Sequence, residues 1–241
     1  MKPVLIWDWD GTLVDSLDYK YEDIWSEIFP EDKKKQKIVI SYIQTPKGKL
    51  VNRYGLIRYV LSVTDNPEIA HWDDETFKNN THVKVLVSRY EHAVKAFLYK
   101  NGLRAGARQT LSSLFQNGYH MYIISGGGTD DSLKEIMKEF DIDKYFRAIF
   151  GFGSKGTSLT RFGKNENFSR VVGLEKNADA SCYVVIGDSI SDYTFTKKIG
   201  SNFIGIKNKW NVWSNDSQRF LVVSSIAEIP TILKKQFLLT T

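Results

Sequence analysis

The chain has 241 residues, of which 42% are hydrophobic and 25% charged, and its formal net charge is +5. This composition excludes a disordered or fibrous protein, and no stretch approaches the roughly 20 apolar residues of a membrane-spanning helix. The single cysteine, Cys182, excludes an intrachain disulfide, and the N-terminal segment MKPVLIWDWD reaches two acidic residues before an export signal could form, so we expect a cytoplasmic protein.

In chain order, the sequence begins with a short apolar run, Val4–Trp9, and then shows only helical spacing from about residue 15 to residue 100. After that segment, strand-like runs alternate with helical patterns such as RQTLSSLFQNG, in which Leu111, Leu114 and Phe115 share one face. The later predicted strands are Tyr119–Ser125, Ala148–Gly153, Tyr183–Gly187, Asn202–Ile206 and Phe220–Val223. This pattern predicts an α/β protein with a doubly wound parallel sheet, formed by residues 1–14 and 101–241, and an inserted helical domain at residues 15–100.

Acidic and hydroxyl side chains follow three of the predicted strands. Asp8, Asp10 and Thr12 follow the first, Ser125 and three glycines end the second, and Asp188 and Asp192 follow the strand Tyr183–Gly187. Ligands of open α/β sheets bind at the carboxyl ends of the strands, so these groups are expected to converge. Carboxylates without basic partners favour a hard cation such as Mg²⁺, and a glycine-rich turn before a helix favours an anion. The pattern therefore suggests phosphoryl transfer.

The same residues resemble the four motifs of the haloacid dehalogenase superfamily. DWDGTLVDS resembles the first motif, IISGG the second, a lysine before the strand Tyr183–Gly187 the third, and GDSISD the fourth. The helical insertion resembles the superfamily's type C1 cap domain. The resemblance implies a Rossmann-like catalytic core and a Mg²⁺-dependent phosphohydrolase that acts on a small phosphorylated metabolite.

The resemblance also implies a role for each motif residue. Asp8 would be the nucleophile that forms an aspartyl phosphate, and Asp10 would be the general acid and base. The side chains of Asp8 and Asp188, with the backbone carbonyl of Asp10, would hold Mg²⁺. Ser125, the N–H of Gly126 and Lys164 would bind the phosphoryl oxygens, and Asp192 would orient the lysine or a metal-bound water.

Several alternatives remain open from the residues alone. Lys155 competes with Lys164 as the motif lysine, because both lie in the segment after Ala148–Gly153 and Asn165 replaces the usual proline. Asp10 argues against a dehalogenase, which lacks the second acid, but a sugar phosphomutase shares nearly all of these residues. A non-catalytic binding module is a third possibility.

Other features of the chain have ordinary explanations. The mixed-sign run EDKKKQK at residues 31–37 is expected to be a solvated helix face rather than a nucleic-acid patch. Without an apolar span we also expect no membrane partner. Aromatic residues of the insertion, such as Trp25 and Tyr59, are expected mainly in its core. The sequence leaves a monomer and a homodimer equally open.

One segment of the insertion is a candidate specificity loop. In IQTPKGKLVNRYG, Pro46 and Gly48 break the helical period and bring Lys47, Lys49 and Arg53 close together in sequence. A glycine-containing loop at a similar place reads the leaving group in C1-capped relatives. The alternative is a basic helix–helix turn in solvent.

Overall fold

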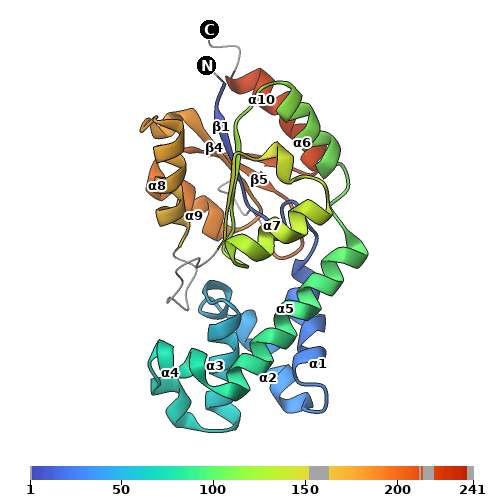
Figure 1. Ribbon diagram of the computed structural model, residues 1–241, viewed down its shortest axis with the longest axis vertical. Coiled ribbons are helices and arrows are strands. Elements are labelled where there is room, and N and C mark those ends of the chain that lie inside the picture. Colours follow the sequence, from blue (N-terminus) through green and yellow to red (C-terminus); the bar gives the residue numbers. More distant parts are fainter. Residues whose placement is uncertain (1, 152–162, 212, 214–219, 238–241) are drawn as a thin grey trace. The chain divides into compact units, whose positions relative to one another are not determined.

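The computed structural model describes residues 2–151, 163–211, 213 and 220–237 (Figure 1). Of these, residues 2–15, 102–151, 164–211, 213 and 220–237 belong to one compact unit, and residues 16–101 and 163 belong to a second. The second unit is thus inserted after the first strand of the first. None of the helices in the described ranges has both the length and the apolar character that crossing a membrane requires.

The first unit is built on a six-stranded sheet with the order β3-β2-β1-β4-β5-β6, in which every neighbouring pair is parallel. Its strands are β1 (Val4–Trp7), β2 (Met121–Ile124), β3 (Ala148–Phe150), β4 (Tyr183–Gly187), β5 (Asn202–Ile206) and β6 (Leu221–Val223). This confirms the predicted fold class. β1 is shorter than predicted because the chain turns at Trp9, whose carbonyl accepts a hydrogen bond from the N–H of Leu13 at 2.9 Å.

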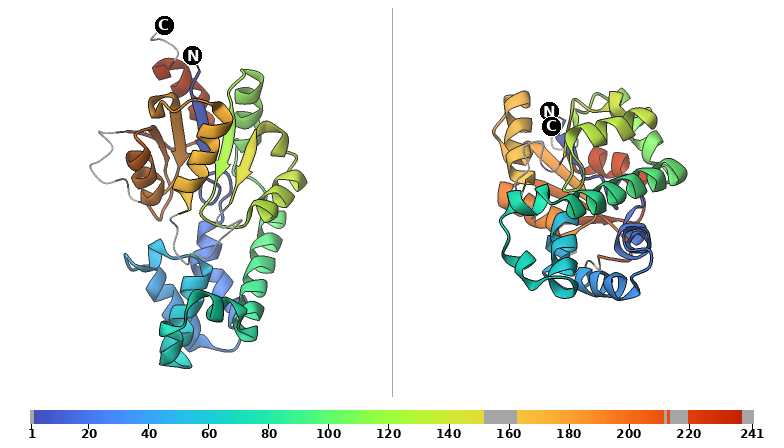
Figure 2. Two further views of the ribbon diagram at one scale, coloured as in Figure 1. Left: turned by 60° about the vertical axis from the view of Figure 1, so that its left-hand side comes forward. Right: turned by 60° about the horizontal axis from the view of Figure 1, so that its bottom comes forward.

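Helices cover both faces of this sheet (Figure 1, Figure 2). One face carries α8 (Lys164–Glu175) and α9 (Ile190–Ile199), and the other carries α6 (Ala107–Gln116), α7 (Asp130–Glu139) and α10 (Ile229–Phe237). Short 3₁₀ turns are η4 (Asp143–Tyr145), η5 (Ala180–Cys182) and η7 (Ile226–Glu228). Val4 and Ile6 pack in one cluster with Val171 of α8 and Phe195 of α9, so the alternate residues of β1 face the opposite layer.

The predicted apolar face of α6 is wrong at one position. Leu111 and Leu114 are buried as expected, whereas half of Phe115 is exposed and its ring lies 5.6 Å from that of Tyr145. The buried stripe of the helix is instead completed by Ala107 and Thr110. The buried stripe of α6 therefore runs toward the N-terminal end of the helix and leaves Phe115 outside it.

The regular elements in the described part of the second unit are helices, and the unit has a core of its own. Its elements are η1 (Tyr19–Asp23), α1 (Ile24–Ile28), α2 (Lys33–Ile43), η2 (Gly48–Leu50), α3 (Arg53–Thr64), η3 (Pro67–His71), α4 (Asp74–Asn79) and α5 (Thr81–Asn101). The long helix α5 packs against α1, α3 and α4. Trp25 is fully buried, and the rings of Tyr42 and Tyr59 stack 3.7 Å apart, so these aromatic residues build the core as expected.

Candidate active site

The nucleophile candidate, Asp8, lies directly after β1 in the middle of the sheet. Its N–H donates to the carbonyl of Ile186 at 2.9 Å, so the chain is still held against β4 at this residue. The side chain is buried, with 8% of the residue exposed. The chain then turns through Gly11, whose φ of 76° favours glycine, and Asp10 in this turn is partly exposed.

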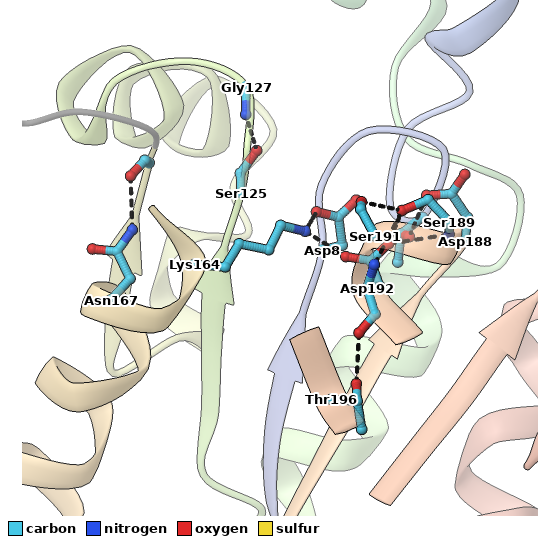
Figure 3. Close-up of polar contacts among 12 residues, drawn as sticks. Asp8, Ser125, Gly127, Lys164, Asn167, Asp188, Ser189, Ser191, Asp192 and Thr196 are labelled. Carbon is cyan, nitrogen blue, oxygen red and sulfur yellow. Dashed lines mark hydrogen bonds and ion pairs between the residues drawn. The ribbon is translucent and has the colours of Figure 1, made fainter. Parts of the chain in front are cut away.

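Lys164, the first residue of α8, brings its ammonium group to Asp8. Its Nζ donates to Asp8 Oδ1 at 2.6 Å and also to Asp192 Oδ1, and only 9% of the lysine side chain is exposed (Figure 3). The structure thus places one of the two candidate motif lysines at Asp8. The other, Lys155, lies outside the described residues.

Asp192 is fully buried in the first turn of α9, so it is not a solvated helix acid. One carboxylate oxygen accepts from Lys164, and the other accepts from the N–H of Ser189 at 3.1 Å and from its hydroxyl at 2.6 Å. This capping box fixes the carboxylate beneath the lysine. Gly187 is required here, because a Cβ on it would lie 2.5 Å from Asp192 Cγ.

Asp188 follows β4 and is 2% exposed. Its Oδ2 accepts from the side-chain amides of Asn208 and Asn211, and the hydroxyl of Thr12 lies 3.4 Å from its Oδ1. The two asparagines were not identified from the sequence, because neutral amides match none of the four motifs. Their position was a usable signal, since both follow Asn202–Ile206 at the same edge of the sheet as the acids.

The candidate phosphate-binding turn follows β2. Ser125 is buried, its N–H donates to the carbonyl of Phe150 at 2.9 Å, and its hydroxyl accepts from the N–H of Gly127 at 3.0 Å. Gly126 is partly exposed, and α7 begins after Thr129, whose hydroxyl caps the helix. The turn therefore presents backbone between a buried serine and a helix N-terminus, the arrangement that anions favour.

Burial and an excess of negative charge control the electrostatics of the site. Burial and the charge of Asp192 raise the pKa of Asp8 to about 7, against the opposing effect of Lys164. Burial and the charges of Asp192 and Asp8 likewise raise the pKa of Asp188 well above its usual value. Burial alone would lower the pKa of Lys164, but Asp192 and Asp8 outweigh it and keep the lysine charged.

The donor chemistry fits a divalent cation. Asp8, Asp188 and Asp192 each offer a carboxylate oxygen within 4.8 Å of the others, with the single ammonium of Lys164 beside them. Asp192 uses both of its oxygens for Lys164 and Ser189, so Asp8 and Asp188 are the better-placed ligands. Counted over the described residues, three carboxylates with one lysine leave a surplus of negative charge that a hard cation would offset.

The raised pKa of Asp8 predicts how the stability of the metal-free protein depends on pH. Because the folded state holds this proton more tightly than the unfolded chain, stability falls as pH rises from about 4 through about 7. Asp8→Asn removes this pH dependence. Relative to the wild type, its free energy of unfolding should therefore rise by about 2 kcal/mol as pH increases from about 5 to about 8.

Urea unfolding of both proteins in chelator checks this prediction at several pH values. Asp179→Asn is the matched control, because Asp179 is an exposed carboxylate before the opposite end of β4. A stability difference between Asp8→Asn and wild type that does not change with pH would contradict the prediction.

The candidate specificity loop lies in the second unit. Lys47 and Lys49 are exposed, whereas Arg53 begins α3 and pairs with Glu91 at 2.5 Å, with 9% of its side chain exposed. Arg53 is therefore engaged within its own unit. The proposed role of this loop rests on the two lysines.

The structure defines an α/β protein with a parallel sheet and a cluster of acids at the strand ends, and comparison with known families places it more closely. The haloacid dehalogenase-like hydrolase family matches residues 3–200, and the chain belongs to this family. The predicted family is confirmed, and with it the expectation of a hydrolytic enzyme. No curated protein matches the chain by sequence.

Solved structures with the same fold cover nearly the whole chain. A phosphatase candidate from Clostridium difficile is 21% identical, with a TM-score of 0.65 over 96% of this chain and 98% of its own. YfnB from Bacillus subtilis, a haloacid dehalogenase-type hydrolase candidate bound to magnesium, is 16% identical, with a TM-score of 0.66 over 97% and 99%. CbbY from Rhodobacter sphaeroides, in complex with phosphate, is 12% identical, with a TM-score of 0.66 over 95% and 96%. At these identities the likeness establishes the fold alone.

Proposed function

We propose that the protein is a Mg²⁺-dependent phosphatase that hydrolyses a small phosphate monoester through an aspartyl phosphate on Asp8. One observation carries this proposal. Asp8 is a buried carboxylate at the end of the central strand, with the ammonium of Lys164 at 2.6 Å and Asp188 in the same cluster. The magnesium of YfnB and the phosphate of CbbY belong to those proteins, and they support the choice of ligands here.

In the proposed reaction a carboxylate oxygen of Asp8 attacks phosphorus as the bond to the leaving oxygen breaks. Asp10 donates a proton to that oxygen and later takes one from the water that cleaves the aspartyl phosphate. The hydroxyl of Ser125, the N–H of Gly126 and the ammonium of Lys164 hold the phosphoryl oxygens. Asp192 acts through Lys164, which it holds in place.

Asp8, Asp188 and the backbone carbonyl of Asp10 are the proposed Mg²⁺ ligands. When bound, the ion supplies positive charge that offsets the charge of the phosphoryl group. Attack requires the ionised form of Asp8, which burial and the charge of Asp192 oppose and the charge of Lys164 favours.

We further propose that residues 16–101 act as a C1 cap that selects the substrate. The exposed Lys47 and Lys49 would favour a substrate with a second negative group, such as a carboxylate. The cytoplasmic location and the oligomeric state remain predictions.

A panel of phosphate monoesters, assayed with Mg²⁺ or with excess chelator, tests the proposed activity. We expect release of inorganic phosphate that chelator abolishes and added Mg²⁺ restores, because the uncompensated acids repel an incoming phosphate. Interconversion of sugar phosphates without phosphate release would instead identify a mutase. Metal-independent hydrolysis, or no reaction with any ester, would contradict the proposal.

A further inference from the structure

A loop that the proposed mechanism does not use contacts the acid cluster. After β5, the N–H of Lys207 donates to the carbonyl of Val223 at 2.9 Å, and the chain then reaches Asn208 and Asn211. The amide of Asn208 donates to Asp188 Oδ2, and the amide nitrogen of Asn211 lies 3.3 Å from the same oxygen. Two donors from one loop thus converge on a single carboxylate oxygen.

The loop's own backbone fixes the orientation of Asn208. Its side-chain oxygen accepts from the N–H of Trp210 at 2.8 Å and from the N–H of Asn211 at 2.9 Å. Because the oxygen is used by these two donors, the amide nitrogen must be the atom that faces Asp188. The hydrogen bond from Asn208 to Asp188 therefore does not depend on a bound ligand.

Trp213, which follows the two asparagines in sequence, is anchored to the sheet. The indole N–H of Trp213 donates to the carbonyl of Ile206 at 3.3 Å. Its ring packs at 5.6 Å from that of Phe203 in β5 and at 5.2 Å from that of Phe220 beside β6. The asparagines are thus carried by a loop with fixed ends rather than by a free surface segment.

We propose that Asn208, assisted by Asn211, is a positioning residue that holds Asp188 in the orientation needed to bind a divalent cation. This inference rests on the metal dependence of the proposed function. A neutral amide orients the carboxylate without cancelling its charge, whereas a lysine would compete with the cation. Both asparagine amides donate to Oδ2 of Asp188, whereas among the described residues Oδ1 has only the long 3.4 Å contact with Thr12. Oδ1 is therefore the oxygen that can bind a ligand.

Mg²⁺ binding to the full-length protein, measured by calorimetry without substrate, tests the inference. We expect Asn208→Ala to weaken Mg²⁺ binding by about tenfold or more, and Asn211→Ala to weaken it less because its contact is longer. In the phosphatase assay, Asn208→Ala should need more Mg²⁺ for half-maximal activity while keeping most of its kcat at saturating Mg²⁺.

Asn202→Ala is the matched control, because this exposed asparagine at the start of β5 donates to the carbonyl of Ser181 at 3.0 Å, away from the acids. It should leave Mg²⁺ affinity unchanged. The thermal midpoint of each variant in chelator reports any purely structural loss. Wild-type affinity in Asn208→Ala would overturn this inference alone, whereas no Mg²⁺ binding by the wild type would overturn it together with the proposed function.

Discussion

Asp8→Asn should lower kcat by at least about 10⁴-fold, because a carboxamide is a poor nucleophile for phosphorus. The fold should persist, since the new side chain has nearly the same shape and the N–H of residue 8 keeps its bond to Ile186. The measurement is phosphate release from the best ester of the panel, with circular dichroism as the check on folding.

The control for this variant is Asp179→Asn, whose carboxylate caps a turn before the opposite end of β4. It should retain wild-type turnover. Near-normal turnover in Asp8→Asn would rule out Asp8 as the nucleophile, whatever the substrate.

Lys164→Met should lower both stability and activity. It leaves the buried carboxylates of Asp8 and Asp192 without their shared cation, and removing one partner of a buried ion pair typically costs about 3–5 kcal/mol. Loss of the charge that meets the phosphoryl group should lower kcat by about 100-fold or more. Urea unfolding and kcat measured at saturating Mg²⁺ check the two effects.

A second substitution separates the charge effect from lost packing. Adding Asp8→Asn to Lys164→Met removes one of the unpaired carboxylates, so the double variant should be more stable than Lys164→Met. Lys144→Met, which breaks a solvent-exposed pair with Asp141, should change little. Asp8→Asn should stabilise Lys164→Met more than it stabilises the wild type, and an equal effect in the two backgrounds would contradict the account of Lys164 as a shared counterion.

The sheet was predictable because its strands are short, apolar and bounded by turn residues. Tyr183–Gly187 and Asn202–Ile206 have the predicted bounds. The face of α6 was harder to predict, because periodicity ranks positions by hydrophobicity. Phe115 therefore seemed a core residue, although the buried positions include Ala107 and Thr110, whose hydroxyl donates to the carbonyl of Ile226 in η7 at 3.4 Å.

The site was only partly predictable. Asp8, Asp188 and Asp192 follow strands, and the common edge of a parallel sheet brings such residues together. Sequence spacing does not say which lysine reaches Asp8; the structure places Lys164 there, and Lys155 lies outside the described residues. Asn208 was not predicted, because its contact with Asp188 depends on the orientation of its side-chain amide, which a sequence pattern does not show.

The most direct test of the account is to trap the phosphoryl group on the enzyme. The wild type is mixed with its best substrate and Mg²⁺, quenched in acid within one turnover, digested, and analysed by mass spectrometry. We predict a peptide containing Asp8 that is heavier by one phosphoryl group, with no such peptide from Asp8→Asn. An active wild-type enzyme whose phosphoryl group appears on another residue, or on none, would contradict the aspartyl phosphate at Asp8.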